Sequence, residues 1–191
     1  MKYAYLNIFG LIIVLVVNYL ANALPINGLD TGEIAAMYPN EFVPAGITFS
    51  IWLVIYLFLI GFCVYPFIVK EAVYLKKIGP LFFITCVFNA SWLIAWHHLE
   101  VWLSVLIMVG LLVTLILIYK RTHQQKSSNK TEKWLVQKTF SIYLAWICVA
   151  LIANITALLV NLNFSPAVPA YWAVAMIMAT QVIVLFINKN Y

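Results

Sequence analysis

The sequence predicts an all-α protein, a polytopic transmembrane helical bundle with six spans and both termini inside. Three observations lead to that fold class: the composition, six long apolar segments, and the placement of the positive charges. Hydrophobic residues make up 65% of the 191 residues and charged residues only 9%, whereas soluble domains contain about 25% charged residues. Six spans leave little chain outside the membrane, so we expect a single membrane domain over residues 1–191.

Six apolar segments approach the length needed to cross a membrane. A helix requires about 20 residues to span about 30 Å of hydrocarbon. Backbone amides within lipid must be bonded inside their own segment, so helices are expected throughout. The predicted spans are residues 4–23, 46–69, 78–97, 101–119, 137–161 and 168–187.

All the Lys and Arg side chains can be placed on one side of the membrane. They are Lys2, Lys70, Lys76, Lys77, Lys120, Arg121, Lys126, Lys130, Lys133, Lys138 and Lys189. The connections 24–45, 97–100 and 162–167 contain no Lys or Arg. Because cytoplasmic loops collect these residues, both termini are predicted to be inside. Attraction to anionic headgroups of the lipid bilayer explains the net charge of +5 more simply than nucleic acid does.

The first span imitates a cleavable signal peptide, because Lys2 precedes a long apolar stretch that ends in Ala21-Asn22-Ala23. The stretch is longer than an ordinary signal core. Retaining it gives the even number of spans that places Lys2 and Lys189 on the same side. We therefore expect residues 1–23 to be retained, with cleavage as the alternative.

The outside loop, residues 24–45, is long enough to have a role of its own. Residues 30–33, Asp-Thr-Gly-Glu, have the spacing of a capping box. They predict a short helix lying over the outer mouth of the bundle. Pro39 and Pro44 then bring an extended chain into the second span, and Pro66 should kink that span near its inner end.

The basic inside loop, residues 120–136, is polar and has no hydrophobic period. It predicts a flexible connector before the span that begins at residue 137. The cysteines Cys63, Cys86 and Cys148 all fall within spans. Their placement favours small apolar core residues over a disulfide framework or a metal cluster.

No metal site is expected. His97, His98 and Glu100 are neighbours in the sequence, but adjacent histidines on a turn point in different directions, and zinc needs three or four converging ligands. We interpret these residues as interfacial polar groups. No Asp or Glu lies inside a predicted span, which argues against a proton relay or ion path.

Three spans each carry an aromatic stripe along one helical face. The stripes consist of Trp52 and Tyr56; of Asn89, Trp92 and Trp96; and of Tyr143, Trp146, Ala150 and Asn154. Asn side chains in hydrocarbon need partners, so these faces should point inward. Two interpretations remain open. Spacing alone favours interhelical packing, and the alternative is an aromatic pocket that opens beneath the outside loop.

The same residues form elements of a known family. Residues 51–56 read Ile-Trp-Leu-Val-Ile-Tyr, residues 89–92 read Asn-Ala-Ser-Trp after a Pro-Leu start, and residues 142–146 read Ile-Tyr-Leu-Ala-Trp with Asn154 eight residues after the Trp. With these elements in this order on the right spans, the chain resembles the translocator protein/tryptophan-rich sensory protein family (TspO/MBR) over about residues 30–161.

The chain also departs from the family pattern. Glu41 and Gly46 stand where the family's loop before the second span has tryptophans, and Ile142 replaces a proline. The family has five spans, so residues 168–187 would be an additional one. Ligand specificity near the outside loop is therefore expected to differ.

The resemblance implies a membrane binding protein or sensor for porphyrins, haem precursors, sterols or other flat apolar molecules, with no tightly bound cofactor. The ligand-binding residues that it implies are Trp52, Tyr56, Asn89, Trp92, Tyr143, Trp146 and Asn154. Some bacterial members are associated with light-dependent porphyrin breakdown that depends on two tryptophans, which line up with Trp52 and Trp146. Whether this chain is an enzyme is left open.

Two other classes of function compete with ligand binding. In a non-catalytic assembly or partner protein, the aromatic faces would only pack helices together, and Gln181 in the last span would seek an interhelical partner. A small-molecule transporter would show inverted repeats or broken helices, which the sequence does not show clearly. We expect a multi-pass protein of the bacterial inner membrane, with a homodimer as an open alternative.

Overall fold

The computed structural model describes residues 1–23, 26–40, 42, 45–69, 72–123, 130–164 and 178. Apart from Met178, the predicted sixth span lies outside the described residues, as do Gln181, Glu41 and Pro44. Every regular element in the described part of the chain is helical.

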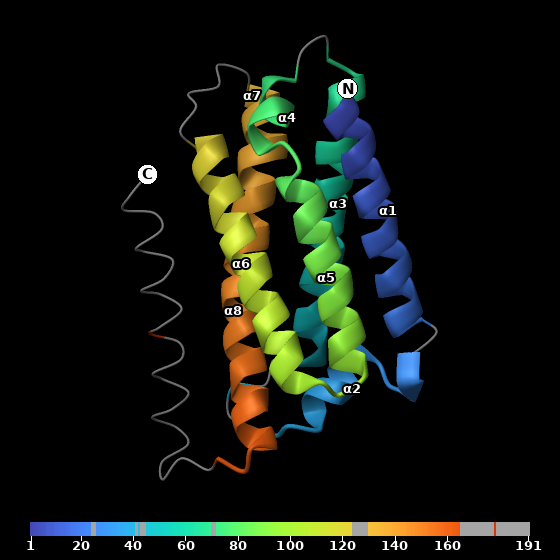
Figure 1. The fold of residues 1–191 in the computed structure, drawn as a ribbon, viewed down its shortest axis with the longest axis vertical. Helices are drawn as coiled ribbons and strands as arrows, with labels where there is room; N and C mark the ends of the chain where they lie inside the picture. The colour runs from blue at the N-terminus through green and yellow to red at the C-terminus, as the bar shows by residue number, and fades with distance from the viewer. Residues whose placement is uncertain are drawn as a thin grey trace.

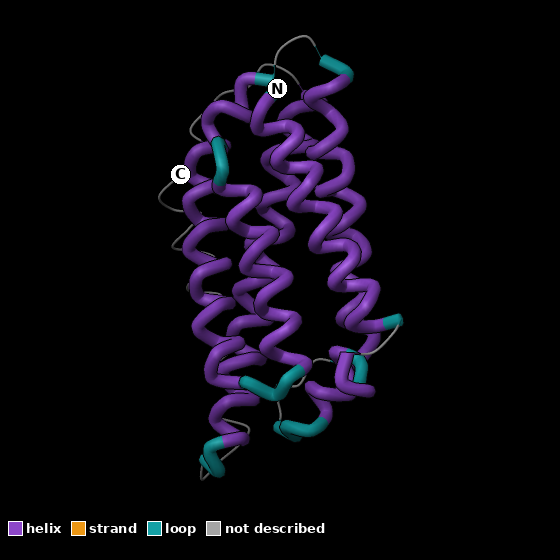
Figure 2. Tube along the Cα trace, turned by 45° about the vertical axis from the view of Figure 1, so that its right-hand side comes forward, coloured by secondary structure: helices purple, strands orange, loops and turns teal. Residues whose placement is uncertain are grey.

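The helices run in the order expected from the sequence. Their bounds are α1 Lys2–Asn22, η1 Ile26–Gly28, α2 Thr31–Ala36, η2 Gly46–Ser50, α3 Ile51–Val64, η3 Tyr65–Phe67, α4 Val73–Ile78, α5 Leu81–His97, α6 Val101–His123, α7 Lys130–Glu132, the π-helical η4 Lys133–Lys138, and α8 Thr139–Asn161. The long helices α1, α3, α5, α6 and α8 lie along the long axis of the bundle (Figures 1 and 2).

Among the described residues, four continuous helical segments are long and apolar enough to cross a membrane. They are Lys2–Asn22, Gly46–Phe67, Val101–His123 and Lys130–Asn161, and Leu81–His97 is a shorter apolar helix. The second segment changes to a 3₁₀ turn at Tyr65–Phe67, around Pro66, near where the proline was expected to disturb it.

The predicted third span is divided in the structure. Residue 78 belongs to the short helix α4, and α5 begins only at Leu81. Gly79 has φ +57°, a conformation that glycine adopts without a side-chain clash. Pro80 follows and lacks the amide hydrogen that a continuing helix would need. The two residues separate α4 from α5 and shorten the apolar helix to 17 residues.

The predicted flexible connector is helical at both of its ends. Helix α6 continues to His123, and the next helix begins at Lys130 rather than at residue 137; residues 124–129 lie outside the described part. The two helical ends of the connector are in contact, since the Gln137 side-chain amide donates to the Thr122 carbonyl at 2.9 Å. Val136 is also buried. Polar sequence alone did not reveal these contacts.

Positive charge gathers at one end of the described bundle. The N-terminus, α4, the last turn of α6, and α7 all lie at that end, whereas α2 and the α5–α6 turn lie at the other (Figure 1). Arg121 joins two of the cationic segments by donating to the Lys77 carbonyl at 3.0 Å. This separation agrees with the charge pattern of the sequence. That the cationic end faces the inside of the cell stays a prediction.

The cationic half of the bundle is filled by aromatic rings. Phe62, Phe82 and Phe140 come from α3, α5 and α8 and are fully buried. Their ring centroids lie 5.0 Å apart for Phe62–Phe82 and for Phe62–Phe140, and 6.1 Å apart for Phe82–Phe140. A cluster of three edge-to-face rings fixes the spacing of three helices.

Replacing Gly10 with Val should destabilise the packing of α1 on α5. A Cβ at Gly10 would lie 3.0 Å from Cδ2 of Phe83 and 3.1 Å from Sγ of Cys86. Overpacking of this kind costs about 1–3 kcal/mol. The apparent melting temperature in detergent should therefore fall for Gly10→Val. It should stay near the wild-type value for Gly46→Val, because a Cβ at Gly46 meets nothing within 4 Å. Equal melting of the two variants would contradict the close α1–α5 contact.

Candidate functional site

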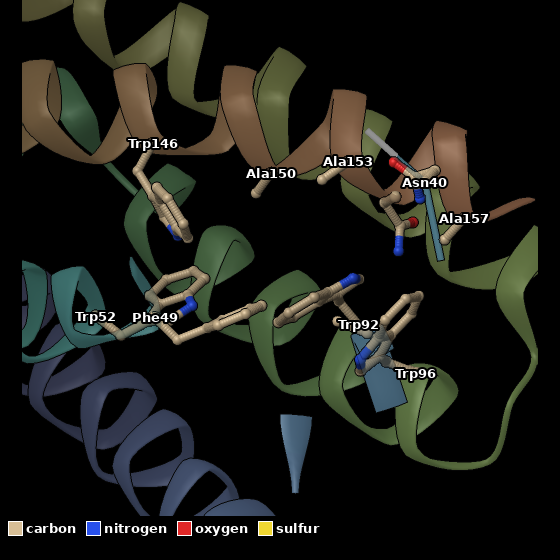
Figure 3. A pocket seen from close by; sticks show the side chains of 11 residues that line it. Asn40, Phe49, Trp52, Trp92, Trp96, Trp146, Ala150, Ala153 and Ala157 are labelled. Atoms are coloured by element: carbon tan, nitrogen blue, oxygen red, sulfur yellow. The ribbon is translucent and has the colours of Figure 1, made fainter. Parts of the chain in front are cut away.

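A cavity lies between α3, α5 and α8, in the half of the bundle that α2 covers (Figure 3). The free volume between these side chains is small, about 40 Å³. The lining residues are Ala35, Asn40, Phe49, Trp52, Trp92, Trp96, Trp146, Ala150, Ala153, Asn154 and Ala157.

The tryptophans of the lining form a continuous array across three helices. Ring centroids are 6.1 Å apart for Trp146–Trp52, 6.1 Å for Trp52–Trp92, and 6.3 Å for Trp92–Trp96. The first pair is edge-to-face and the last pair is stacked. All four side chains are buried. The array presents an extended π-surface to the cavity, and flat aromatic groups stack well on such a surface.

The opposite wall is made of small side chains. Helix α8 places Ala150, Ala153 and Ala157 along one face, which Figure 3 shows across the cavity from Trp92 and Trp96. Their spacing of three and four residues keeps them in line. Because a methyl group reaches only a short distance from the helix, this face leaves a slot beside the indoles.

Behind the array, a chain of polar side chains links three helices. Asn18 of α1 donates its amide to the Asn89 carbonyl oxygen at 3.3 Å, and the Asn89 amide donates to the Tyr143 hydroxyl at 3.0 Å. The Tyr143 ring lies edge-to-face on Trp52 at 5.9 Å. Buried amides in an apolar bundle need such partners. The chain therefore supports Trp52 from the side away from the cavity.

The segment over the mouth, residues 26–38, is bonded to the end of α5 through His97. This side chain is fully buried. Its Nδ1 lies 3.1 Å from the Ile26 carbonyl, and its Nε2 lies 3.1 Å from the Thr31 hydroxyl. A carbonyl only accepts, so Nδ1 carries the hydrogen. Trp96 adds a bond from its indole N–H to the Thr31 carbonyl at 3.3 Å.

Helix α2 itself begins as the sequence predicted. The Asp30 carboxylate accepts from the backbone of Gly32 and Glu33, and the Glu33 carboxylate accepts from the Asp30 backbone, which completes the capping box. Close by, Tyr38 packs on Trp96 with ring centroids 5.9 Å apart. Burial raises the pKa of Tyr38 above its ordinary value, so its ring covers the array as a neutral group.

A second hollow lies between α1 and α3. Its free volume is larger, about 310 Å³, and its lining residues are Leu15, Asn18, Tyr19, Asn22, Thr31, Phe49, Trp52, Leu53, Tyr56 and Leu93. Phe49 and Trp52 also line the first cavity. These two aromatic side chains are therefore a wall shared by both hollows.

The structure places the predicted ligand-binding residues in three different surroundings. Trp52, Trp92, Trp146 and Asn154 line the cavity between α3, α5 and α8. Tyr56 lines the second hollow, whereas Asn89 and Tyr143 belong to the polar chain behind Trp52. The stripes do point inward, as expected, since both Asn89 and Asn154 are buried.

Sequence reasoning missed several lining residues and the role of His97. Phe49 and Asn40 come from the segment before α3, where no period marks an inward face. Trp96 is part of the stripe that one interpretation assigns to a pocket, but it is not among the ligand-binding residues that the resemblance implies. His97 is buried against Ile26 and Thr31, contacts that its interpretation as an interfacial polar residue did not include, whereas His98 is exposed.

Four membrane-length helices, the shorter α5 and their buried aromatic interior define an all-α, multi-pass membrane protein. The model of the family described as TSPO-like protein matches residues 4–191, and the chain belongs to that family. The match confirms the resemblance to the TspO/MBR family. It includes residues 168–187, so the predicted sixth span lies within the matched region. No curated protein and no solved structure matches the chain significantly.

Replacing His97 with Ala should loosen the segment over the cavity. The variant loses both ring contacts and leaves the buried Thr31 hydroxyl without this partner, at a cost of about 1–3 kcal/mol, and it also frees the part-buried Ile26 carbonyl. Amide hydrogen exchange of residues 26–38 should become faster. The control is His98→Ala, because His98 contacts only the Ile94 carbonyl of its own helix. Unchanged exchange in His97→Ala would show that other contacts hold the segment.

Proposed function

We propose that this protein binds flat apolar molecules, tetrapyrrole-like or sterol-like, in the cavity between α3, α5 and α8. The observation that carries the proposal is the slot between the tryptophan array and the alanine face of α8. A rigid planar molecule that displaced the side chains around this slot would stack on the indoles. The role would be sensing, sequestration or transfer of the ligand, in a bacterial inner membrane with both termini inside.

The hollow itself supports binding over simple helix packing. If the aromatic stripes served only to hold helices together, the indoles of α5 would be expected to meet large side chains of α8. They face alanines across a cavity instead. The bundle has a separate aromatic contact between the same helices at its other end, around Phe62.

Photochemical turnover is the finer part of the proposal, and it rests on the family resemblance. Trp52 and Trp146 are in edge-to-face contact, with ring centroids 6.1 Å apart. Both line the cavity, so a bound porphyrin would lie against this pair. Indole is among the side chains most easily oxidised, and an excited porphyrin is an oxidant. Transfer of an electron from the pair to the excited ring would be the first step.

Titration with protoporphyrin IX in the dark should quench tryptophan emission in a saturable way. The double variant Trp52→Phe, Trp146→Phe should bind about tenfold more weakly, since each aromatic contact contributes about 0.5–1.5 kcal/mol. The control is Trp102→Phe, Trp134→Phe, which alters two side chains that are 56% and 60% exposed. Absence of saturable quenching in the wild type would defeat the proposal. Subsequent illumination tests turnover through loss of porphyrin absorbance.

Filling the slot should block binding without weakening the bundle. Ala153→Leu places a larger apolar side chain in the cavity, so porphyrin affinity should fall at least tenfold. The melting temperature should hold or rise, because filling a cavity is commonly stabilising. Ala145→Leu on the exposed face of the same helix is the matched control. If Ala153→Leu bound porphyrin as well as the wild type, the ligand would have to lie elsewhere.

A further inference from the structure

Some polar groups around the cavity already have hydrogen-bond partners. The Trp96 N–H is bonded to the Thr31 carbonyl at 3.3 Å. The Asn40 amide donates to the Tyr38 carbonyl at 2.7 Å and accepts from the Phe42 backbone at 2.8 Å. The Ser104 hydroxyl donates to the side-chain oxygen of Asn154 at 3.0 Å.

The indole N–H of Trp92 lacks a hydrogen-bond partner among the described residues. It is buried, and the whole side chain is only 5% exposed. Figure 3 shows its nitrogen on the edge of the ring that faces the cavity. Buried N–H groups are nearly always paired in folded proteins, so one without a partner at a cavity calls for an explanation.

The Trp92 ring is also held in place. It stacks on Trp96 with 19° between the ring planes and lies tilted by 31° on Trp52. Trp96 is in turn bonded to the segment over the mouth. A ring fixed between two others cannot turn easily to find another acceptor, so the donor is presented to the cavity in advance.

The indole N–H of Trp146 has different surroundings from that of Trp92. Its N–H likewise has no hydrogen-bond partner, but the ring meets Trp52 edge-to-face at 87°, and Figure 3 shows its nitrogen on the side of Trp52. An N–H directed at an aromatic face is partly compensated. The donor that most needs a partner is therefore that of Trp92.

We propose that the ligand presents a neutral hydrogen-bond acceptor, such as a ketone or ester carbonyl, to the Trp92 indole N–H. This inference rests on the proposed function and specifies its ligand class. Indole nitrogen only donates, so the matching group must accept. The acceptor is neutral because no described residue of the lining carries a charge, and burying a carboxylate without a cationic partner is very unfavourable. Carboxylates of a larger ligand would remain at the mouth.

A matched pair of rigid flat molecules tests this inference. 9-Fluorenone and fluorene share the same three-ring frame and differ in one carbonyl group. Their dissociation constants are measured by calorimetry on the detergent-purified full chain. We expect fluorenone to bind about five- to tenfold more tightly, the usual gain from one hydrogen bond at a buried donor.

Two variants locate the effect. Trp92→Phe should bring the fluorene-to-fluorenone ratio of dissociation constants close to one. Trp96→Phe should keep the wild-type ratio even if both affinities change, because the Trp96 N–H is already bonded to Thr31. A ratio that persists in Trp92→Phe would overturn the inference.

A measurement on the wild type covers the case in which Trp92→Phe does not fold. The infrared carbonyl band of bound fluorenone should shift to lower wavenumber than in a hydrocarbon solvent. An unshifted band, or equal affinity for the two molecules, would overturn the inference and leave the proposed function standing. If neither molecule nor protoporphyrin IX bound, the proposed function itself would fail.

Discussion

Trp52 holds the centre of this structure together. Its ring contacts Tyr56 of its own helix, Trp92 of α5, and Tyr143 and Trp146 of α8, with centroid distances between 5.6 and 6.1 Å. In a membrane, lipid competes with every apolar contact, so close packing and internal hydrogen bonds must hold the helices. Trp52 meets this requirement by stacking on one side and, through Tyr143, by reaching the amide chain of Asn89 and Asn18.

The two ends of the bundle differ in how the space between α3, α5 and α8 is filled. At the cationic end, Phe62, Phe82 and Phe140 fill the space between three helices. At the other end, the same three helices place indoles opposite alanines and leave a cavity. The segment over that cavity is fixed by buried His97. The cationic end is therefore closely packed, and the other end contains a cavity beneath the segment that His97 holds.

The sequence predicted the helices well, because apolar runs and helical periods are local properties. The family resemblance implied Trp52, Trp92, Trp146 and Asn154 as pocket residues, whereas spacing alone favoured packing; all four line the cavity. Asn89 and Tyr143 lie on the same helical faces. A helical face extends beyond the cavity, and these two side chains lie behind Trp52. The contacts of His97, the placement of Phe49, and the helical ends of the inside loop depend on residues distant in sequence, which no local pattern reveals.

The central claim is that a flat ligand lies between the tryptophan array and the alanine face of α8. An experimental structure with 2-bromofluorenone bound, with bromine located by anomalous scattering, tests it most directly. The account predicts a bromine peak in the slot beside Ala153, with the carbonyl directed at Trp92. A peak confined to the second hollow, between α1 and α3 beside Leu15 and Tyr56, would contradict it and move the ligand to the other side of Trp52.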